Sequence, residues 1–293
     1  MDHHYVPKFY LRQWADPSRH DGQLWSYRKV RADKVDEKPI GPSGTGFERN
    51  LYAAPDALGW SDYDPHVIET SFLQKIDDDA AKVLLKLLGP DPMGISDGQR
   101  RQWAIFLSSL LQRSPAVLGP RDAAAASVAR QATNALLGRY IDPARRAEVA
   151  AIIAEYDTVQ MAMTSSRTFM VQEIKNHDTL GFITGMRWAV VDRDPSTRPA
   201  LTSSAPLDAG TKCPGLWTMP ISPQRIFFAF PPTVPVDEEL RSSLTNVAAH
   251  HDALVLNGCT TIYSPHRLSG EALSEVERAL LGKIDWTPSQ CSG

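Results

Sequence analysis

The sequence has few cysteines, little net charge and no long apolar run. Its three cysteines, Cys213, Cys259 and Cys291, are unequally spaced, which fits neither a disulfide framework nor a C-x-x-C metal clip. The formal net charge of -3 gives no overall positive field for unspecific nucleic-acid binding. No stretch approaches the ~20 apolar residues of a membrane span, and the first residues do not form a secretory signal. We therefore expect a cytoplasmic protein that makes no membrane contact.

Several common catalytic motifs are also missing. The chain contains no G-x-x-x-x-G-K-[ST], no G-x-G-x-x-G after a predicted strand, no G-x-S-x-G and no H-E-x-x-H. These absences argue against P-loop NTPases, Rossmann dehydrogenases, ordinary α/β-hydrolases and zinc proteases. The composition is that of an ordinary globular protein, 42% hydrophobic and 22% charged over 293 residues, which allows a sizeable core.

Helical periodicity dominates residues 64–175. An Asp-Pro start at residue 64 and a Gly-Pro stop at residue 89 bound a first apolar stripe at helical spacing. A second stripe follows Ser96, and it predicts a helix that ends near residue 114. The Ala-rich segment 121–175, broken by Asp-Pro at 142, predicts further helices that pack against one another.

The rest of the chain alternates between short strand-like runs and helices. Aromatic-rich alternation predicts a strand at 24–29, and the charged, Pro- and Gly-rich stretch 30–46 predicts a surface loop. Segment 180–232 is β-rich and suggests an antiparallel sheet, and 236–283 contains closing helices around a short strand, TTIYS. We expect an α+β fold: a predominantly helical single domain, 1–293, with a small antiparallel sheet, in which segment 1–30 packs on helices 64–175.

The first residues, MDHHYVPKFYLRQW, form an unusually dense aromatic and apolar cluster. Each large side chain contributes roughly 1.5 to 3 kcal/mol when it is fully buried, so this segment is expected to be anchored in the interior. The adjacent His3 and His4 would then be held in place. In an extended segment they point to opposite faces, so they are not expected to bind one ion together.

Four side chains are candidates for catalysis: His3, His4, Glu69 and Arg113. A histidine could act as a base, an anion-contacting donor or a metal ligand, and Glu69 lies beside the apolar stripe of the first helix. Arg113, at a helix exit, could reach a carboxylate or phosphate in bidentate fashion. For each, a purely structural role is the alternative.

The remaining polar candidates are weaker. Arg12 could bind an anion, and Asn246 and His250 share one face of a predicted helix, where they could present an amide and an imidazole to a ligand. The acidic run Asp77, Asp78 and Asp79 is interpreted as a solvated helix face.

The opening block from His3 to Trp14 resembles the H-H-Y-V-P-x-F-Y-L-R-x-F opening of a mainly bacterial family known as domain of unknown function 4238. Further similar pieces follow in the same order: ERNLY at 48–52, Ile68-Glu69 with Ile76-Asp77, QRSP at 112–115, MPISP at 219–223, and Asn246 before IYS. The resemblance covers most of the chain. It implies a shared fold and supports His3, His4, Arg12, Glu69, Arg113 and Asn246 as candidates, but brings no activity with it.

One departure from that family bears on activity. Its members usually carry T-S-D-N-P where this chain reads T-S-S-A-P, so that Ser204 stands in place of the aspartate. If that aspartate is catalytic in relatives, its role here is lost or passes to a nearby acid such as Asp208.

Two functions remain open from the sequence. The first is a hydrolase of the nuclease or phosphodiesterase type that acts on phosphodiester or nucleotide substrates. Its partner would be a nucleic acid or an anionic small molecule, and its candidate cofactor is a divalent metal. The alternative is a noncatalytic binding or assembly module in which the same residues form a structural polar network.

Overall fold

The structure is a computed structural model that describes residues 1–19, 22–54, 64–139, 142–154, 158–210, 215–235, 238–249, 251–252 and 259–282. Its strands are β1 (Asp2–His4), β2 (Leu24–Arg31), β3 (Lys34–Ile40), β4 (Phe47–Arg49), β5 (Arg187–Asp192), β6 (Thr202–Ser203), β7 (Asp208–Ala209), β8 (Trp217–Ser222), β9 (Arg225–Phe230) and β10 (Thr261–Ser264). Its α-helices are α1 (Lys8–Leu11), α2 (Gln74–Leu87), α3 (Asp97–Gln112), α4 (Pro115–Gly138), α5 (Pro143–Ala154), α6 (Thr158–Ile174), α7 (His177–Gly185), α8 (Glu238–Ala249) and α10 (Gly270–Leu280). Two 3-10 helices, η1 (Arg12–Trp14) and η2 (Pro42–Gly44), and a π-helix, η3 (Ile68–Leu73), complete the described elements, which together form the expected α+β fold.

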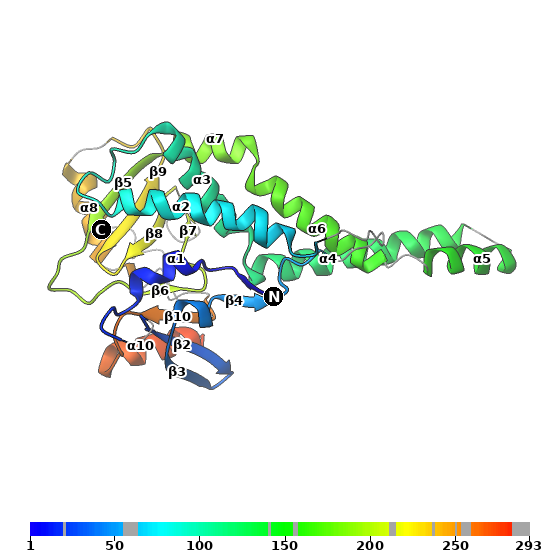
Figure 1. Ribbon diagram of the computed structural model, residues 1–293, viewed down its shortest axis with the longest axis horizontal. Helices are drawn as coiled ribbons and strands as arrows, with labels where there is room; N and C mark the ends of the chain where they lie inside the picture. The colour runs from blue at the N-terminus through cyan, green and yellow to red at the C-terminus, as the bar shows by residue number, and fades with distance from the viewer. Residues whose placement is uncertain are drawn as a thin grey trace.

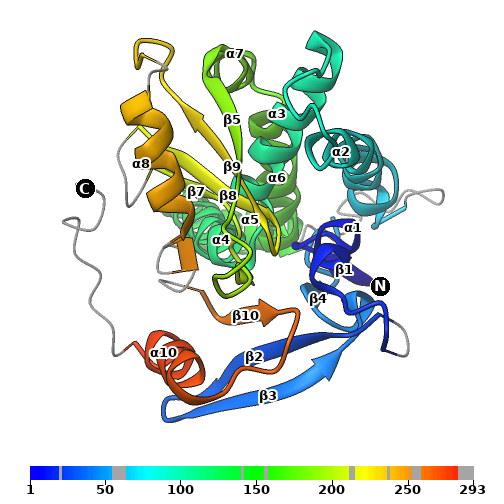
Figure 2. The ribbon, with the colours of Figure 1, turned by 90° about the vertical axis from the view of Figure 1, so that its left-hand side faces the viewer.

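The described strands form three antiparallel sheets. One is the short pair β1-β4, and the two others have four strands each, in the orders β3-β2-β10-β6 and β5-β9-β8-β7. Strand β10 lies beside β2, with Thr261 opposite Arg28, so residues from both ends of the described chain share one sheet. Figure 2 shows this sheet below the β5-β9-β8-β7 sheet, with the first residues of the chain at the side of both.

The helices form a layer against the sheets and an arm that extends from it. Helices α2 and α3 pack together beside the sheets, and α4 and α6 run side by side and continue with α5 away from the body (Figure 1). Helix α3 begins with a capping box, in which Ser96 accepts from the Gln99 amide and the Gln99 side chain accepts from Ser96. The predicted start at Ser96 is therefore confirmed.

The first residues of the chain are buried, as their composition predicts. Val6, Tyr10, Leu11 and Trp14 are fully buried in a core that also contains apolar side chains of α2, α3 and β9. The Tyr10 hydroxyl donates to the Pro220 carbonyl at 2.7 Å, and the Trp14 indole donates to the Ala200 carbonyl at 2.7 Å. Helix α1 thus lies between α2 and the β3-β2-β10-β6 sheet, where it joins the helical layer to both sheets (Figure 1).

The helix predicted to start at residue 64 starts later, with the π-helix at Ile68, and two other segments also differ from the prediction. Residues 34–40, predicted as loop, form β3, an edge strand paired with β2. Charged residues and Pro39 favoured a loop, but edge strands commonly carry such residues because they discourage pairing with another chain. Residues 180–185, predicted as strand, belong to α7. Asn176 caps this helix by accepting from the amides of Asp178 and Thr179, a local signal that outweighs the β-rich composition after it.

Candidate functional site

His3 and His4 lie on β1, which pairs with β4. His3 is opposite Glu48 and His4 opposite Phe47. Because neighbouring side chains of a strand point to opposite faces, the two imidazoles enter different surroundings. His3 stacks on Tyr52, with ring centroids 5.4 Å apart, whereas His4 lies 5.3 Å from the Phe47 ring. Both are buried, with 0% and 7% exposure, so neither is a surface histidine.

The hydrogen bonds of His3 fix its tautomer. The Tyr52 amide donates to His3 Nδ1 at 2.8 Å, which requires that Nδ1 carry no proton. His3 Nε2 is then the protonated nitrogen of the neutral ring, and it donates to His66 Nδ1 at 3.1 Å. Burial, followed by the nearby His66, lowers the pKa of His3 to about 4. Both nitrogens of His3 are thus occupied, and its geometry suits positioning Tyr52 and His66 rather than accepting a substrate proton.

His4 is joined to Glu69 of η3. The His4 amide donates to Glu69 Oε1 at 3.2 Å, across 65 positions of sequence. Burial, followed by the charge of Lys8, lowers the pKa of His4 to about 4, so that its ring is neutral at pH 7. Burial raises the pKa of Glu69, and the His4 amide and the Arg113 charge oppose this shift. The Glu69 carboxyl thus contacts the backbone of His4, and the pKa of each side chain is shifted mainly by burial.

Arg113 caps the C-terminal end of α3 and is fully buried. Its Nη1 donates to Asp77 Oδ1 at 2.8 Å, its carbonyl accepts from the Tyr52 hydroxyl at 2.8 Å, and its guanidinium lies over the ring of Phe106. Burial raises the pKa of Asp77, and Arg113 opposes that shift. The charge of Arg113 also contributes to the pKa shifts of His4 and Glu69, which places these three groups in one electrostatic cluster.

Four buried polar atoms of this cluster have no hydrogen-bond partner within the described part of the chain. They are His4 Nε2, Glu69 Oε2, and Nε and Nη2 of Arg113. Nε and Nη2 are the two donors on one side of the guanidinium, the arrangement that binds a carboxylate or phosphate in bidentate fashion. Most buried polar atoms in proteins are paired, because each unpaired one costs about 1 to 3 kcal/mol. His4, Glu69 and Arg113, called the polar cluster below, thus present an acceptor, a carboxyl oxygen and a cationic fork.

The sequence predictions missed two members of these surroundings and misassigned one. Asp77 was interpreted as part of a solvated face, but its side chain is only 22% exposed and pairs with Arg113. Its position two helical turns after Glu69 was the available signal, since residues at such spacing lie near one helix face. His66 and Tyr52 were not singled out. Their roles depend on His3, which is distant in sequence and reaches them only in the fold.

Two of the three ligand-binding candidates do not join the polar cluster, and the third is not among the described residues. Arg12 is an exposed residue of η1. Asn246 is an exposed residue of α8, a helix that packs on β5 and lies far from β1 in both ribbon views (Figures 1 and 2). His250 lies outside the described residues. These positions remain predictions from the sequence alone.

Ser204, which stands where the resemblance leads us to expect an aspartate, has a structural role in the sheet. Ser204 Oγ accepts from the amides of Thr260 at 3.1 Å and Thr261 at 3.3 Å, and thereby links β6 to β10. Asp208, the alternative acid, is buried on β7, opposite Thr218 of the neighbouring strand β8 in the β5-β9-β8-β7 sheet. These partners of Ser204 and Asp208 are not residues of the polar cluster.

Within the described ranges, no three His, Cys, Asp or Glu side chains are grouped so that they could hold a metal ion. Nor does any helix described here have both the length and the apolar character needed to cross a bilayer.

Comparison with known proteins matches this chain to one family model. Neither the curated proteins nor the solved structures contain a match to this chain. The sequence profile of the family described as "Protein of unknown function (DUF4238)" matches residues 2–264, a range that includes β1, the π-helix and Arg113. Since that match covers most of the sequence, the chain belongs to the DUF4238 family.

Proposed function

We propose that the protein is a hydrolase of phosphodiester or nucleotide substrates and that the polar cluster is its active site. The observation that carries the proposal is the set of unpartnered buried atoms on His4, Glu69 and Arg113. A polar network that serves only packing is expected to satisfy its members, because a half-satisfied network is less stable than an apolar core. Unpaired donors and acceptors of complementary chemistry are instead expected where a substrate supplies the partners.

Each member has a chemical role in this proposal. Arg113 donates from Nε and Nη2 to two phosphate oxygens, and its charge offsets the charge that develops in the transition state. His4 is neutral at pH 7 and accepts a proton from the attacking water at Nε2. A bound phosphate adds negative charge beside His4 and raises its pKa, which makes it a stronger base in the complex. Glu69, whose pKa is raised by burial, donates a proton to the leaving oxygen.

The residues around the polar cluster act through it. His3 holds the Tyr52 amide and His66, and Asp77 holds Nη1 of Arg113, which orients the opposite side of the guanidinium. The π-helix carries Glu69, and π-helical turns often occur at functional sites. These are positioning roles.

The second candidate is a noncatalytic binding or assembly module. It is favoured by one observation: His3, Tyr52 and Arg113 are completely buried and join segments that are distant in sequence. In this case the network fixes the N-terminal segment against α2 and α3 and carries out no reaction.

Activity and stability measurements on the same variants separate the two candidates. Purified protein is incubated with RNA, DNA, nucleotides and bis(p-nitrophenyl) phosphate, with either EDTA or divalent cations. His4→Gln, Glu69→Gln and Arg113→Lys are compared with His177→Gln, which changes an exposed histidine with 92% side-chain exposure. The hydrolase proposal predicts turnover by the wild type and by His177→Gln, and a decrease of about 10²- to 10⁴-fold in His4→Gln with a nearly unchanged melting temperature.

The opposite pattern supports the assembly module. Lower melting temperatures in all three variants, with no substrate turned over faster by the wild type than by His4→Gln, would refute the hydrolase proposal.

A further inference from the structure

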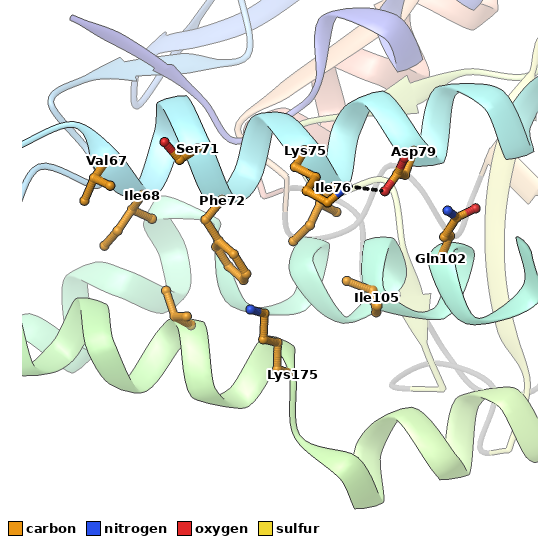
Figure 3. Close-up of a pocket in the computed structure, with 11 residues that line it drawn as sticks. Val67, Ile68, Ser71, Phe72, Lys75, Ile76, Asp79, Gln102, Ile105 and Lys175 are labelled. Carbon is orange, nitrogen blue, oxygen red and sulfur yellow. Dashed lines mark hydrogen bonds and ion pairs between the residues drawn. The ribbon is translucent and has the colours of Figure 1, made fainter. Parts of the chain in front are cut away.

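A cavity lies at a different face of the π-helix from the one that carries Glu69. This cavity of about 440 Å³, open to solvent, is lined by η3 and α2 on one side and by α3 and α6 on the other. Its apolar wall contains Ile68, Phe72, Ile76, Ile105 and Val171. Figure 3 shows these helices around the cavity, with Phe72 directed into it from η3. Cavities of this volume with mostly apolar walls are typical small-molecule sites.

The polar groups of the cavity carry an excess of positive charge. Lys75, Lys175 and Asp79 are its charged lining residues. Asp79 is already paired, with Lys75 Nζ at 3.3 Å and with Lys82 Nζ, outside the cavity, at 3.5 Å. An anion bound near these residues would therefore experience a net positive charge, because the lysine side chains outnumber the single Asp79 carboxylate.

Lys175 is the lysine best placed to bind such an anion. It follows the last residue of α6, and its Nζ lies 4.8 Å from the centroid of the Phe72 ring. Figure 3 shows this ammonium group turned toward Phe72. An ammonium group that lies over an aromatic ring still has N–H donors for an anion, because the ring contacts only one side of the ammonium group. The cavity thus places a cation beside an apolar surface.

We propose that this cavity binds a small amphiphile with one aliphatic chain and an anionic head, of the size of a medium-chain fatty acid. The chain lies along Ile68, Phe72 and Val171, and the head group accepts from the Lys175 ammonium. This proposal does not depend on hydrolysis at the polar cluster, since the cavity residues belong to a different face of the π-helix.

The test uses decanoate below its micellar concentration, with binding to the full chain measured by isothermal titration calorimetry. We expect one site per chain. Octanoate should bind roughly tenfold more weakly, because two methylene groups fewer are buried. Decyl phosphate distinguishes a phosphate head from a carboxylate head. Decanol, which is neutral, and decyltrimethylammonium, which is cationic, test the charge requirement, and each of these two should bind more weakly than decanoate.

Two variants test the location, and one serves as a control. Lys175→Met removes the cation and should weaken decanoate binding by about tenfold while leaving decanol binding unchanged. Ser71→Trp places a large ring at an exposed lining position and should abolish binding. Lys86→Met changes an exposed lysine of α2 outside the cavity and should bind as the wild type does. Circular dichroism establishes that each variant is folded.

Several outcomes would overturn the proposal. They are absence of saturable binding, equal affinity for decanoate and decanol, or unchanged binding in a folded Ser71→Trp variant. A concentration-dependent dimer that Ser71→Trp disrupts would show that a second copy of the chain covers the cavity instead.

Discussion

The two buried histidines predict a specific dependence of stability on pH. Burial lowers the pKa of His3 and of His4 from 6.5 to about 4. In the unfolded chain both rings regain a value near 6.5, so between these two values the unfolded state binds more protons than the folded state. Their contribution to stability is complete above pH 6.5, and it is lost as the pH falls toward 4.

The size of this loss follows from the two pKa values. At pH 5 the histidine ring is mostly protonated in the unfolded chain and mostly neutral in the folded one. Each histidine therefore lowers the free energy of unfolding by about 2 kcal/mol between pH 7 and pH 5. Both rings are less than a tenth exposed, so solvent screening reduces this value little. Together, His3 and His4 account for about 4 kcal/mol, a large fraction of the 5 to 15 kcal/mol that stabilises a typical protein.

Urea unfolding at pH 7 and pH 5, followed by tryptophan fluorescence, measures the effect. His3→Gln and His4→Gln should each lose about 2 kcal/mol less than the wild type over this interval, whatever their stability at pH 7. His177→Gln, an exposed position, should lose as much as the wild type. If the two buried-site variants lose as much stability as the wild type between these pH values, the histidines do not titrate as their burial requires.

Three further predictions concern the network and the N-terminal anchor. Arg113→Met should lower the free energy of unfolding by about 3 kcal/mol, because it leaves the Asp77 carboxylate without its cation. Adding Asp77→Leu should recover part of this loss, and urea-unfolding free energies that are additive for the two changes would contradict the pairing. Trp14→Ala should lower the free energy of unfolding by about 3 to 5 kcal/mol because it opens a cavity, whereas Leu85→Ala, at an exposed position, should lower it by less than 1 kcal/mol. Equal unfolding free energies for these two variants would refute the anchoring role of Trp14. Tyr10→Phe should cost about 1 to 3 kcal/mol in the same assay, because its hydroxyl bonds two buried groups, and an unchanged value would contradict those bonds.

The parts of the fold that were predictable are those specified by neighbouring residues. The strand after residue 24 and the start of α3 at Ser96 follow from alternation and from a capping box, both of which operate within a few positions. The pairing of β10 with β2 could not be derived in this way. Its register joins Thr261 to Arg28, and such distant pairing is decided by the packing of the whole sheet.

The candidate site shows the same division. His3, His4, Glu69 and Arg113 could be selected by residue type and by family resemblance, and the structure buries or half-buries all four. Their partners could not be selected, because each partnership spans tens of residues and depends on burial. Asp77 illustrates the difference: the acidic run that contains it is typical of a solvated face, yet the fold turns this one carboxylate toward a buried guanidinium.

The π-helix connects the two proposed sites. Ile68 and Phe72 of η3 line the apolar cavity, while Glu69, between them in sequence, accepts from the His4 amide in the polar cluster. A π-helical turn is rare and is often found at functional sites. In this one, Glu69 accepts from the His4 amide and Leu73, which is 1% exposed, packs in the core. Ligand binding on either face would therefore act on a helical segment that contacts the first residues of the chain.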